Sequence, residues 1–385
     1  MSKPNIGLYL DQRKILVMDQ IISASTNYFP LFVPLMLNDL ETLGEIAFFQ
    51  SFYIFYIGIS RAALGTSQII NRGFINRYRL LVYGSVFSII AGYISSAFIF
   101  LDDLEVIPAI LVFTLPIIQD VLRFEYISNH KAGLALSSDI TWLFSSILCG
   151  IFFYFQGYNL TSLLIASWSI GAGPSIVWLL LNRSKSFTGS IKATKARVSK
   201  RFIVRMGATG FISELNTIAT NWIITMSTSA LLLGTFRFYQ LCFLPVAFLI
   251  NVNRLTLIQM FKSENKELSK KWLRKQEYLR VIFYICGVLV SLTLLGFKLQ
   301  YLANSMIVAF AVEFAFKRNT IYLNLMANGK EKRVIENLVI YLAISLAFFS
   351  IFAQTQIVLL LIISLCGIEF FSYLLLILKL RKMHD

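Results

Sequence analysis

Charged side chains lie inside several long apolar stretches of this sequence, where an isolated charge is costly. At the centre of a membrane-spanning helix a charge costs about 2.5–3.5 kcal/mol on insertion scales, so such residues usually face protein or water. Arg61, Arg237 and Arg254 carry the planar guanidinium group that suits phosphate oxygens. We therefore predict that these three arginines bind an anionic substrate.

Snorkelling is the alternative for these arginines, because a stem can lie along lipid while its charged head reaches the interface. This alternative stays open for Arg254, which lies close to the expected cytoplasmic surface, and for the more external Arg237. Arg61 lies about eight residues, near 12 Å by helical rise, from the cytoplasmic end of its span. Its depth favours substrate binding.

Carboxylates in the apolar stretches are candidates for ion or proton coupling. Asp19, Glu214 and Glu313 are the three that we select. Asp19 and Glu214 have a second interpretation, because an acidic residue near a helix N-terminus is stabilised by the helix dipole. They are also candidate counter-ions.

Two apolar segments carry opposite charges at a spacing that lets them pair along one helix face. Asp120 and Arg123 are three residues apart, and Glu313 and Lys317 are four apart. Because pairing lowers the cost of insertion, a structural role is favoured for the first pair, whereas Glu313 keeps both interpretations. Asp139 has no partner that the sequence identifies.

Metal and cofactor chemistry is not expected from the residue types present. The two histidines, His130 and His384, fall in predicted loops, and the four cysteines are scattered singly with no CxxC spacing. We therefore predict no metal site and no cofactor.

The segments that must position the charges are apolar and about 20 residues long. The chain has 385 residues, of which 57% are hydrophobic and 14% are charged; a soluble domain typically has about 25% charged residues. A helix of about 20 residues crosses a hydrocarbon core of roughly 30 Å. The sequence predicts an all-α polytopic membrane protein with about twelve transmembrane helices. The expected spans are 15–37, 45–69, 80–101, 106–127, 135–155, 161–181, 207–228, 232–260, 278–297, 301–326, 335–353 and 356–378.

Basic residues gather in alternate connections, which explains the net charge of +15. The alternate set of loops carries a single basic residue, Lys298. By the positive-inside rule the basic loops and both termini are cytoplasmic. The charge is thus a topology signal in contact with membrane lipids rather than a sign of nucleic-acid binding.

A weak internal repeat relates the two halves of the chain. At an offset of 190 residues, LGEIAFFQSFYIF from Leu43 aligns with LGTFRFYQLCFLP from Leu233. The predicted domains are an N-lobe of six helices (1–181), a basic cytoplasmic linker (182–206) and a C-lobe of six helices (207–385). Because six is even, both halves begin on the same side, and a pseudo-two-fold axis along the membrane normal is expected. The alternative is a coincidence of membrane composition.

Three stretches carry a resemblance to a known family. They are DQIISASTNYFPLFVPLMLNDLETLGEIAFFQSFYIF, QDVLRFEYISNHKAGLALSSDITWL and LLLGTFRFYQLCFLPVAFLINVNRLTLIQMF. The chain resembles the polysaccharide (O-unit, or O-antigen) flippases of the multidrug/oligosaccharidyl-lipid/polysaccharide exporter superfamily. The resemblance implies a transporter of the cell inner membrane that moves a lipid diphosphate-linked oligosaccharide outward by alternating access. It also implies partners that polymerise or assemble the polysaccharide.

Other functions stay open. A drug or cation exporter of the same superfamily would bind its substrate with buried acids rather than exposed arginines. A membrane-bound glycan polymerase or glycosyltransferase would need a sizeable polar loop, and the basic linker has no carboxylate, His or Cys for acid–base chemistry. We therefore expect a transporter and not an enzyme.

Overall fold

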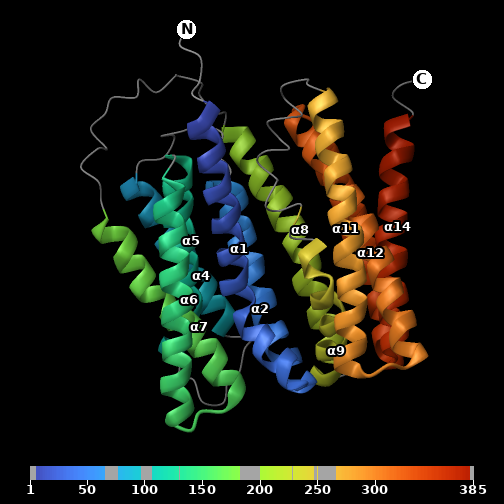
Figure 1. Cartoon of the computed structure of the whole chain (residues 1–385), viewed down its shortest axis with the longest axis horizontal. Coiled ribbons are helices and arrows are strands. Elements are labelled where there is room, and N and C mark those ends of the chain that lie inside the picture. Colours follow the sequence, from blue (N-terminus) through green and yellow to red (C-terminus); the bar gives the residue numbers. More distant parts are fainter. Residues whose placement is uncertain are drawn as a thin grey trace. The chain divides into compact units, whose positions relative to one another are not determined.

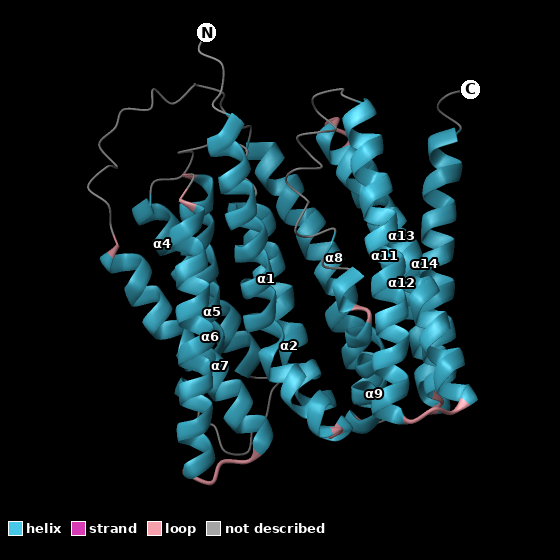
Figure 2. Ribbon diagram, in the orientation of Figure 1, coloured by secondary structure: helices cyan, strands magenta, loops and turns pink. Residues whose placement is uncertain are grey.

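The computed structural model describes residues 6–65, 77–96, 106–129, 131–182, 200–227, 229–246, 249 and 266–381. Within these ranges every regular element is a helix (Figures 1 and 2). The long helices are α1 (Ile6–Leu37), α2 (Leu40–Ser60), α4 (Arg77–Ser96), α5 (Val106–Ser128), α6 (Ala132–Phe155), α7 (Leu160–Leu181), α8 (Lys200–Ser227), α9 (Ala230–Cys242), α11 (Lys266–Leu295), α12 (Leu299–Ala327), α13 (Glu331–Phe352) and α14 (Val358–Arg381). Each of the twelve expected spans overlaps one of them.

The expected span 232–260 differs most from its helix. Helix α9 ends at Cys242, and the N–H of Phe243 turns back to the carbonyl of Gln240 at 3.2 Å. Pro245 follows three residues after Cys242, and a proline ring has no N–H and clashes with the carbonyl four residues earlier. The proline therefore ends the continuous helix, and residues 250–265 lie outside the described part.

Seven described segments are long and apolar enough to cross a membrane by themselves. They are Leu40–Gly65, Ala132–Phe155, Leu160–Leu181, Gln276–Leu295, Leu299–Met326, Lys332–Thr355 and Val358–Lys379. An apolar helix of this length satisfies all its backbone groups internally, which the bilayer core requires. The chain is a multi-pass, all-α membrane protein.

Helix α6 exposes apolar side chains and buries a charged one, the reverse of a helix in a soluble protein, as contact with lipid requires. Large apolar side chains at one helical face are exposed, whereas the carboxylate of Asp139 on the same helix is fully buried. The exposed side chains are Phe144, Leu148, Ile151, Phe152 and Phe155. This spacing places them on a single stripe of a 3.6-residue helix. The stripe is the surface expected to face acyl chains.

The chain divides into two compact units. The first contains Met1–Val33 and Phe52–Glu214, and the second contains Pro34–Ser51 and Leu215–Asp385. Helices α1, α2 and α8 each contribute residues to both units. This division differs from a simple split at the linker, of which residues 183–199 lie outside the described part. The expected division into an N-lobe and a C-lobe at 182–206 therefore stays a prediction.

Helices α2 and α9 begin with the same kind of cap, at positions that correspond in the sequence repeat. Asp39 precedes α2 and accepts a hydrogen bond from the backbone N–H of Thr42 through Oδ1 (3.1 Å). Ser229 precedes α9 and accepts from the N–H of Leu232 through Oγ (3.3 Å). Both are N-caps that satisfy a backbone donor left over in the first helical turn. Residues 39 and 229 are 190 apart.

The same two helices touch each other through glycine within the second unit. A β-carbon on Gly44 would collide with the carbonyl oxygen of Ala230, and one on Gly234 would collide with the carbonyl oxygen of Leu40. The contact is reciprocal. Leu40 and Gly44 of α2 correspond to Ala230 and Gly234 of α9 at the offset of 190 residues, and each glycine meets the carbonyl of the other helix. Only glycine allows two backbones to approach this closely. The repeated LG dipeptides therefore mark a helix crossing.

Candidate functional site

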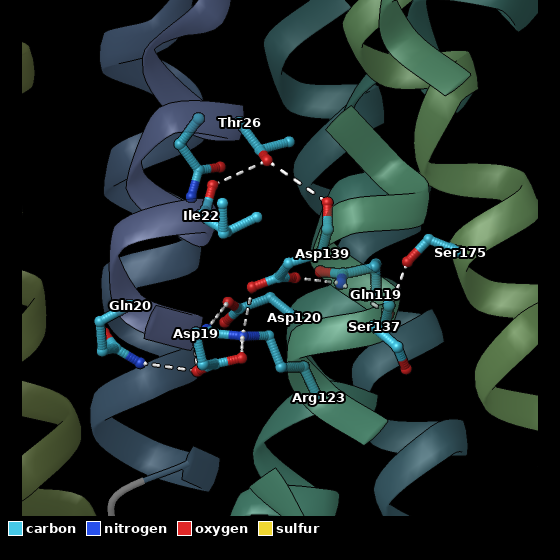
Figure 3. Close-up of polar contacts among 12 residues, drawn as sticks. Asp19, Gln20, Ile22, Thr26, Gln119, Asp120, Arg123, Ser137, Asp139 and Ser175 are labelled. Carbon is cyan, nitrogen blue, oxygen red and sulfur yellow. Dashed lines mark hydrogen bonds and ion pairs between the residues drawn. The ribbon is translucent and has the colours of Figure 1, made fainter. Parts of the chain in front are cut away.

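Five charged side chains gather in the first unit. This ionic cluster consists of Asp19 of α1, Arg61 after α2, Asp120 and Arg123 of α5, and Asp139 of α6. The three aspartates and Arg123 are at most 2% exposed. Figure 3 shows the carboxylates of Asp19, Asp120 and Asp139 approaching Arg123 from three helices. Four helix segments that are distant in sequence are thus connected through charge.

Arg123 is the centre of the ionic cluster. Its Nη2 donates to Oδ2 of Asp19 at 2.5 Å, and its Nε lies 3.4 Å from Oδ1 of the same residue. Nε also lies 2.8 Å from Oδ2 of Asp139, but that oxygen accepts no hydrogen bond, so the contact is an ion pair outside hydrogen-bond geometry. Nη1 lies 3.6 Å from Oδ1 of Asp120. One guanidinium group therefore has three carboxylates around it.

Amide side chains hold two of these carboxylates in place. Gln119 donates through Nε2 to Oδ1 of Asp139 (2.8 Å), and Gln20 donates through Nε2 to Oδ2 of Asp19 (3.1 Å). A buried carboxylate needs such donors, because an unmet acceptor in an apolar interior is costly. The network fixes the positions of both acids (Figure 3).

Arg61 is the most accessible member of the cluster. It opens a π-helical turn, Arg61–Gly65, that continues α2, and such turns are frequent at functional sites. Its Nη2 donates to Oδ1 of Asp120 at 2.6 Å, and its Nε lies 2.9 Å from Oδ2. The Arg61 side chain is 36% exposed, against 3% for Asp120. Two donors of the Arg61 guanidinium group thus bind the Asp120 carboxylate, and the Arg61 side chain still reaches the surface.

A small pocket opens beside Arg61. It is too narrow to admit a water molecule in this structure and is lined by Ser60, Arg61, Leu64, Gly65, Asp120, Val121 and Phe124. The guanidinium carbon of Arg61 lies 5.8 Å from the centre of the Phe124 ring. The pocket therefore combines a cation, a carboxylate and an aromatic wall.

The ionic cluster has more acid than base. Its three carboxylates face two guanidinium groups, which leaves a formal charge of −1 when all five are ionised. Burying charge costs several kcal/mol per ion unless the pairing geometry is good. The formal balance of these five side chains therefore favours a further cation or a proton. Arg61, whose side chain is 36% exposed, is the point at which an anion can approach them.

Arg237, the second predicted arginine, lies in the second unit. It is half-buried on α9, donates through Nη1 to Oε1 of Gln240 (2.6 Å) and through Nη2 to Oδ1 of Asn221 of α8 (2.5 Å). These amide partners orient the guanidinium plane without adding negative charge. Arg254, the third, lies outside the described residues.

The predicted coupling acids lie in three different environments. Asp19 belongs to the ionic cluster. Glu214 of α8 packs against α2, where a β-carbon on Gly58 would touch its Cγ. Glu313 of α12 is paired with Lys317 at 3.3 Å, as its i, i+4 spacing predicted, and with Arg280 of α11 at 3.3 Å. Each acid therefore has a different set of neighbours.

A second buried ion pair lies in the second unit, and the sequence did not reveal it. Nη1 of Arg318 in α12 lies 2.8 Å from Oε2 of Glu369 in α14. The hydroxyl of Tyr341 in α13 donates to Oε1 of Glu369 at 2.7 Å, and its ring lies 3.9 Å from the Arg318 guanidinium carbon. We call these three residues the arginine–tyrosine cluster. Their only sequence signal is a charge inside an apolar helix.

Metal binding has no support from the described part of the chain. There, no group of three or more His, Cys, Asp or Glu side chains is arranged to hold a metal ion. In the ionic cluster the cation among the three aspartates is the guanidinium of Arg123 itself.

Comparison with known proteins finds relatives by structure alone. No family model matches the sequence, and no curated protein matches it significantly. The structure is similar to a MOP superfamily transporter from Pyrococcus furiosus, with 12% identity, a TM-score of 0.64 and 100% of each chain covered. It is also similar to an outward-facing multidrug resistance MATE family transporter, with 13% identity, a TM-score of 0.64, and 97% of this chain and 94% of that one covered.

A third similar structure is the MATE transporter ClbM in complex with Rb⁺, with 12% identity, a TM-score of 0.56, and 96% of this chain and 93% of that one covered. At such low identities the similarity shows the fold and not the substrate. The full-length match is to a fold of two six-helix lobes. This chain has the fold of the MOP superfamily transporters.

Proposed function

We propose that this protein is a flippase that moves a lipid diphosphate-linked oligosaccharide across the cytoplasmic membrane by alternating access, for surface polysaccharide assembly. The observation that supports this proposal most directly is the position of Arg61. Its side chain is partly exposed, begins a π-helical turn and lines a pocket. A guanidinium binds phosphate oxygens through two parallel N–H donors, so a diphosphate is the substrate group that fits.

The narrowness of the pocket limits which part of the substrate can reach Arg61. The pocket has no room for a water molecule in this structure, so a phosphate reaches Arg61 only when neighbouring side chains move. We therefore propose that Arg61 contacts the diphosphate alone, while lipid and sugar lie outside the pocket. Arg237 is the second proposed phosphate ligand, and Arg254 is the third.

Ion coupling completes the proposal. Asp19 is the strongest of the three candidate acids, because it belongs to a buried group whose carboxylates outnumber its guanidinium groups. Glu214 and Glu313 are the further candidates. The proposed location is the cell inner membrane with both termini in the cytoplasm, and the proposed partners are membrane lipids and proteins that assemble the polysaccharide.

A drug or cation exporter is the second candidate function, and the excess of acid in the ionic cluster favours it. Similar structures illustrate both possibilities. ClbM is described in complex with Rb⁺. For the transporter from Pyrococcus furiosus, the reverse polarity of its binding pocket suggests a different function. The sign of charge in the pocket is therefore the property to measure.

Transport in liposomes separates the two functions. Purified protein would be reconstituted with fluorescent polyprenyl diphosphate-linked glycans, and in parallel with a fluorescent organic cation. We expect outward movement of the glycan lipids, reduced at least about tenfold in Arg61→Gln. Arg205→Gln, which removes an exposed arginine of α8, is the matched control and should keep transport within about twofold. Transport of the organic cation without any glycan lipid would reject the flippase and support the exporter.

A further inference from the structure

The carboxylate of Asp120 lies between two guanidinium groups. Its Oδ1 is 2.6 Å from Nη2 of Arg61 and 3.6 Å from Nη1 of Arg123. Oδ2 completes the fork on Arg61 through Nε, at 2.9 Å. Asp120 is therefore paired more closely with Arg61, the arginine that lines the pocket, than with Arg123. Arg123, which is only 1% exposed, is its more distant partner.

A carboxylate on Arg61 occupies the place that a phosphate would take. Both groups present two oxygens to the same pair of N–H donors, and the fork that Asp120 makes has this geometry. Asp120 itself is 3% exposed and lines the same pocket. An entering phosphate and this carboxylate cannot both use Nε and Nη2.

The displaced carboxylate would not be left alone in an apolar interior, which would be costly. Arg123 already lies within ion-pair distance of Oδ1, so a small rotation of the Asp120 side chain is enough to keep it paired. Asp19 and Asp139 hold Arg123 in position from α1 and α6. The ionic cluster thus offers Asp120 a second guanidinium group, that of Arg123, next to that of Arg61.

We infer that Asp120 is an internal competitor for phosphate at Arg61, and that phosphate binding transfers its carboxylate to Arg123. The inference rests on the proposed function, because it takes Arg61 as the phosphate ligand. Asp120 acts as a positioning residue that sets affinity and allows release. Through Arg123, the transfer would also connect an anion at the pocket to the carboxylates of Asp19 and Asp139.

The size of the effect follows from the fraction of molecules in which Arg61 is open. Apparent affinity falls in proportion to the population that can bind. A pair that is closed in about nine of ten molecules lowers affinity about tenfold. Asp120→Asn removes the competing charge and should therefore raise affinity at least about tenfold.

Binding of radiolabelled inorganic pyrophosphate to the full chain in nanodiscs tests this directly. We expect at least about tenfold tighter binding in Asp120→Asn and no measurable binding in Arg61→Gln or in the double variant. Asp120→Glu keeps the charge and should stay within about threefold of the parent protein. If Asp120→Asn does not elute as a folded protein, Asp120→Ser makes the same test.

Asp139→Asn is the control for net charge. It removes a carboxylate from the same cluster, one that contacts Arg123 and Gln119. We expect a gain below about threefold. An equal gain in Asp139→Asn and Asp120→Asn would show a general charge effect and overturn the competition.

Transport kinetics add a readout that a merely structural role would not change. In proteoliposomes with the glycan lipid, both KM and kcat should fall in Asp120→Asn, because tighter binding slows release. A lower kcat with an unchanged KM would overturn the inference.

The failures of the two proposals are distinguishable. Unchanged affinity in Asp120→Asn, with binding still lost in Arg61→Gln, would overturn the competition and leave Arg61 as the phosphate ligand. Binding that is insensitive to Arg61→Gln, or no binding to any of the proteins, would overturn the phosphate site and the competition together.

Discussion

Each compact unit buries an arginine, and the two arginines have different surroundings. Arg123 of α5 is 1% exposed and has carboxylates from α1, α5 and α6 around it. Arg318 of α12 is 6% exposed and is paired with a single carboxylate, Glu369. Aromatic rings complete its environment: those of Tyr341 and Tyr322 lie 3.9 and 5.7 Å from its guanidinium carbon.

The difference separates a cluster with unmatched charge from one that is balanced. Arg318 and Glu369 cancel each other and tie α12 to α14, which suits a structural role. The ionic cluster keeps an additional carboxylate and extends to the surface through Arg61. Because burying an excess of charge is costly, the additional carboxylate among these five residues is the feature that the proposed transport function would account for.

Arg123→Met should have the largest effect on stability. It would leave three carboxylates without their shared cation, and removing one partner of a buried pair typically costs about 3–5 kcal/mol. We expect loss of most folded protein, measured by size-exclusion chromatography and thermal unfolding in detergent. A variant that unfolds within a few degrees of the parent protein would show that Arg123 is not the centre of the cluster.

Glu369→Leu should come next, and here a second substitution should restore stability. Alone it leaves Arg318 buried without its carboxylate, at a cost of about 3 kcal/mol. The double variant Arg318→Met/Glu369→Leu should recover all but about 1 kcal/mol, since a buried pair replaced by apolar groups is often neutral. Transport should be retained. Loss of transport in a stable double variant would contradict a purely structural role for the arginine–tyrosine cluster.

Tyr341→Phe isolates one hydrogen bond of that cluster. The change removes the donor to Oε1 of Glu369 but keeps the ring beside Arg318. A typical net hydrogen bond contributes about 0.5–1.5 kcal/mol, and one to a charged group about 1.5–3 kcal/mol, so we expect a loss near 1.5 kcal/mol. Chemical unfolding monitored by tryptophan fluorescence measures it. A loss above about 4 kcal/mol would mean that the ion pair depends on this hydroxyl.

Arg61→Ala should have the smallest effect on stability and a large effect on transport. Its side chain is 36% exposed, and the buried Asp120 carboxylate that it leaves behind stays within ion-pair distance of Arg123. Abundance and membrane insertion should therefore be retained while export falls. Normal export in a fully inserted Arg61→Ala protein would remove Arg61 from the site.

The sequence predicted the helices well because apolar length is a local property. It also predicted the pairs along one helix, Glu313 with Lys317 and Asp120 with Arg123, because helical spacing places such residues on one face. In the second case the closer partners of Arg123 are Asp19 and Asp139.

Tertiary pairs were the part that could not be predicted. Asp19 and Arg123 are 104 residues apart, and nothing periodic connects them. The same is true of Arg61 and Asp120, which are 59 residues apart. Charge inside an apolar segment identified each of these residues, but only the packing of α1, α2, α5 and α6 shows which ones meet.

The crossing of α2 and α9 has a consequence for mutational tolerance. At Gly44 and Gly234 the obstacle to a side chain is a main-chain carbonyl of the other helix, which cannot rotate away as a side chain would. Even a methyl group would require whole helices to separate. In a library of all single substitutions, both positions should be depleted together, although neither residue carries a charge or lines the pocket.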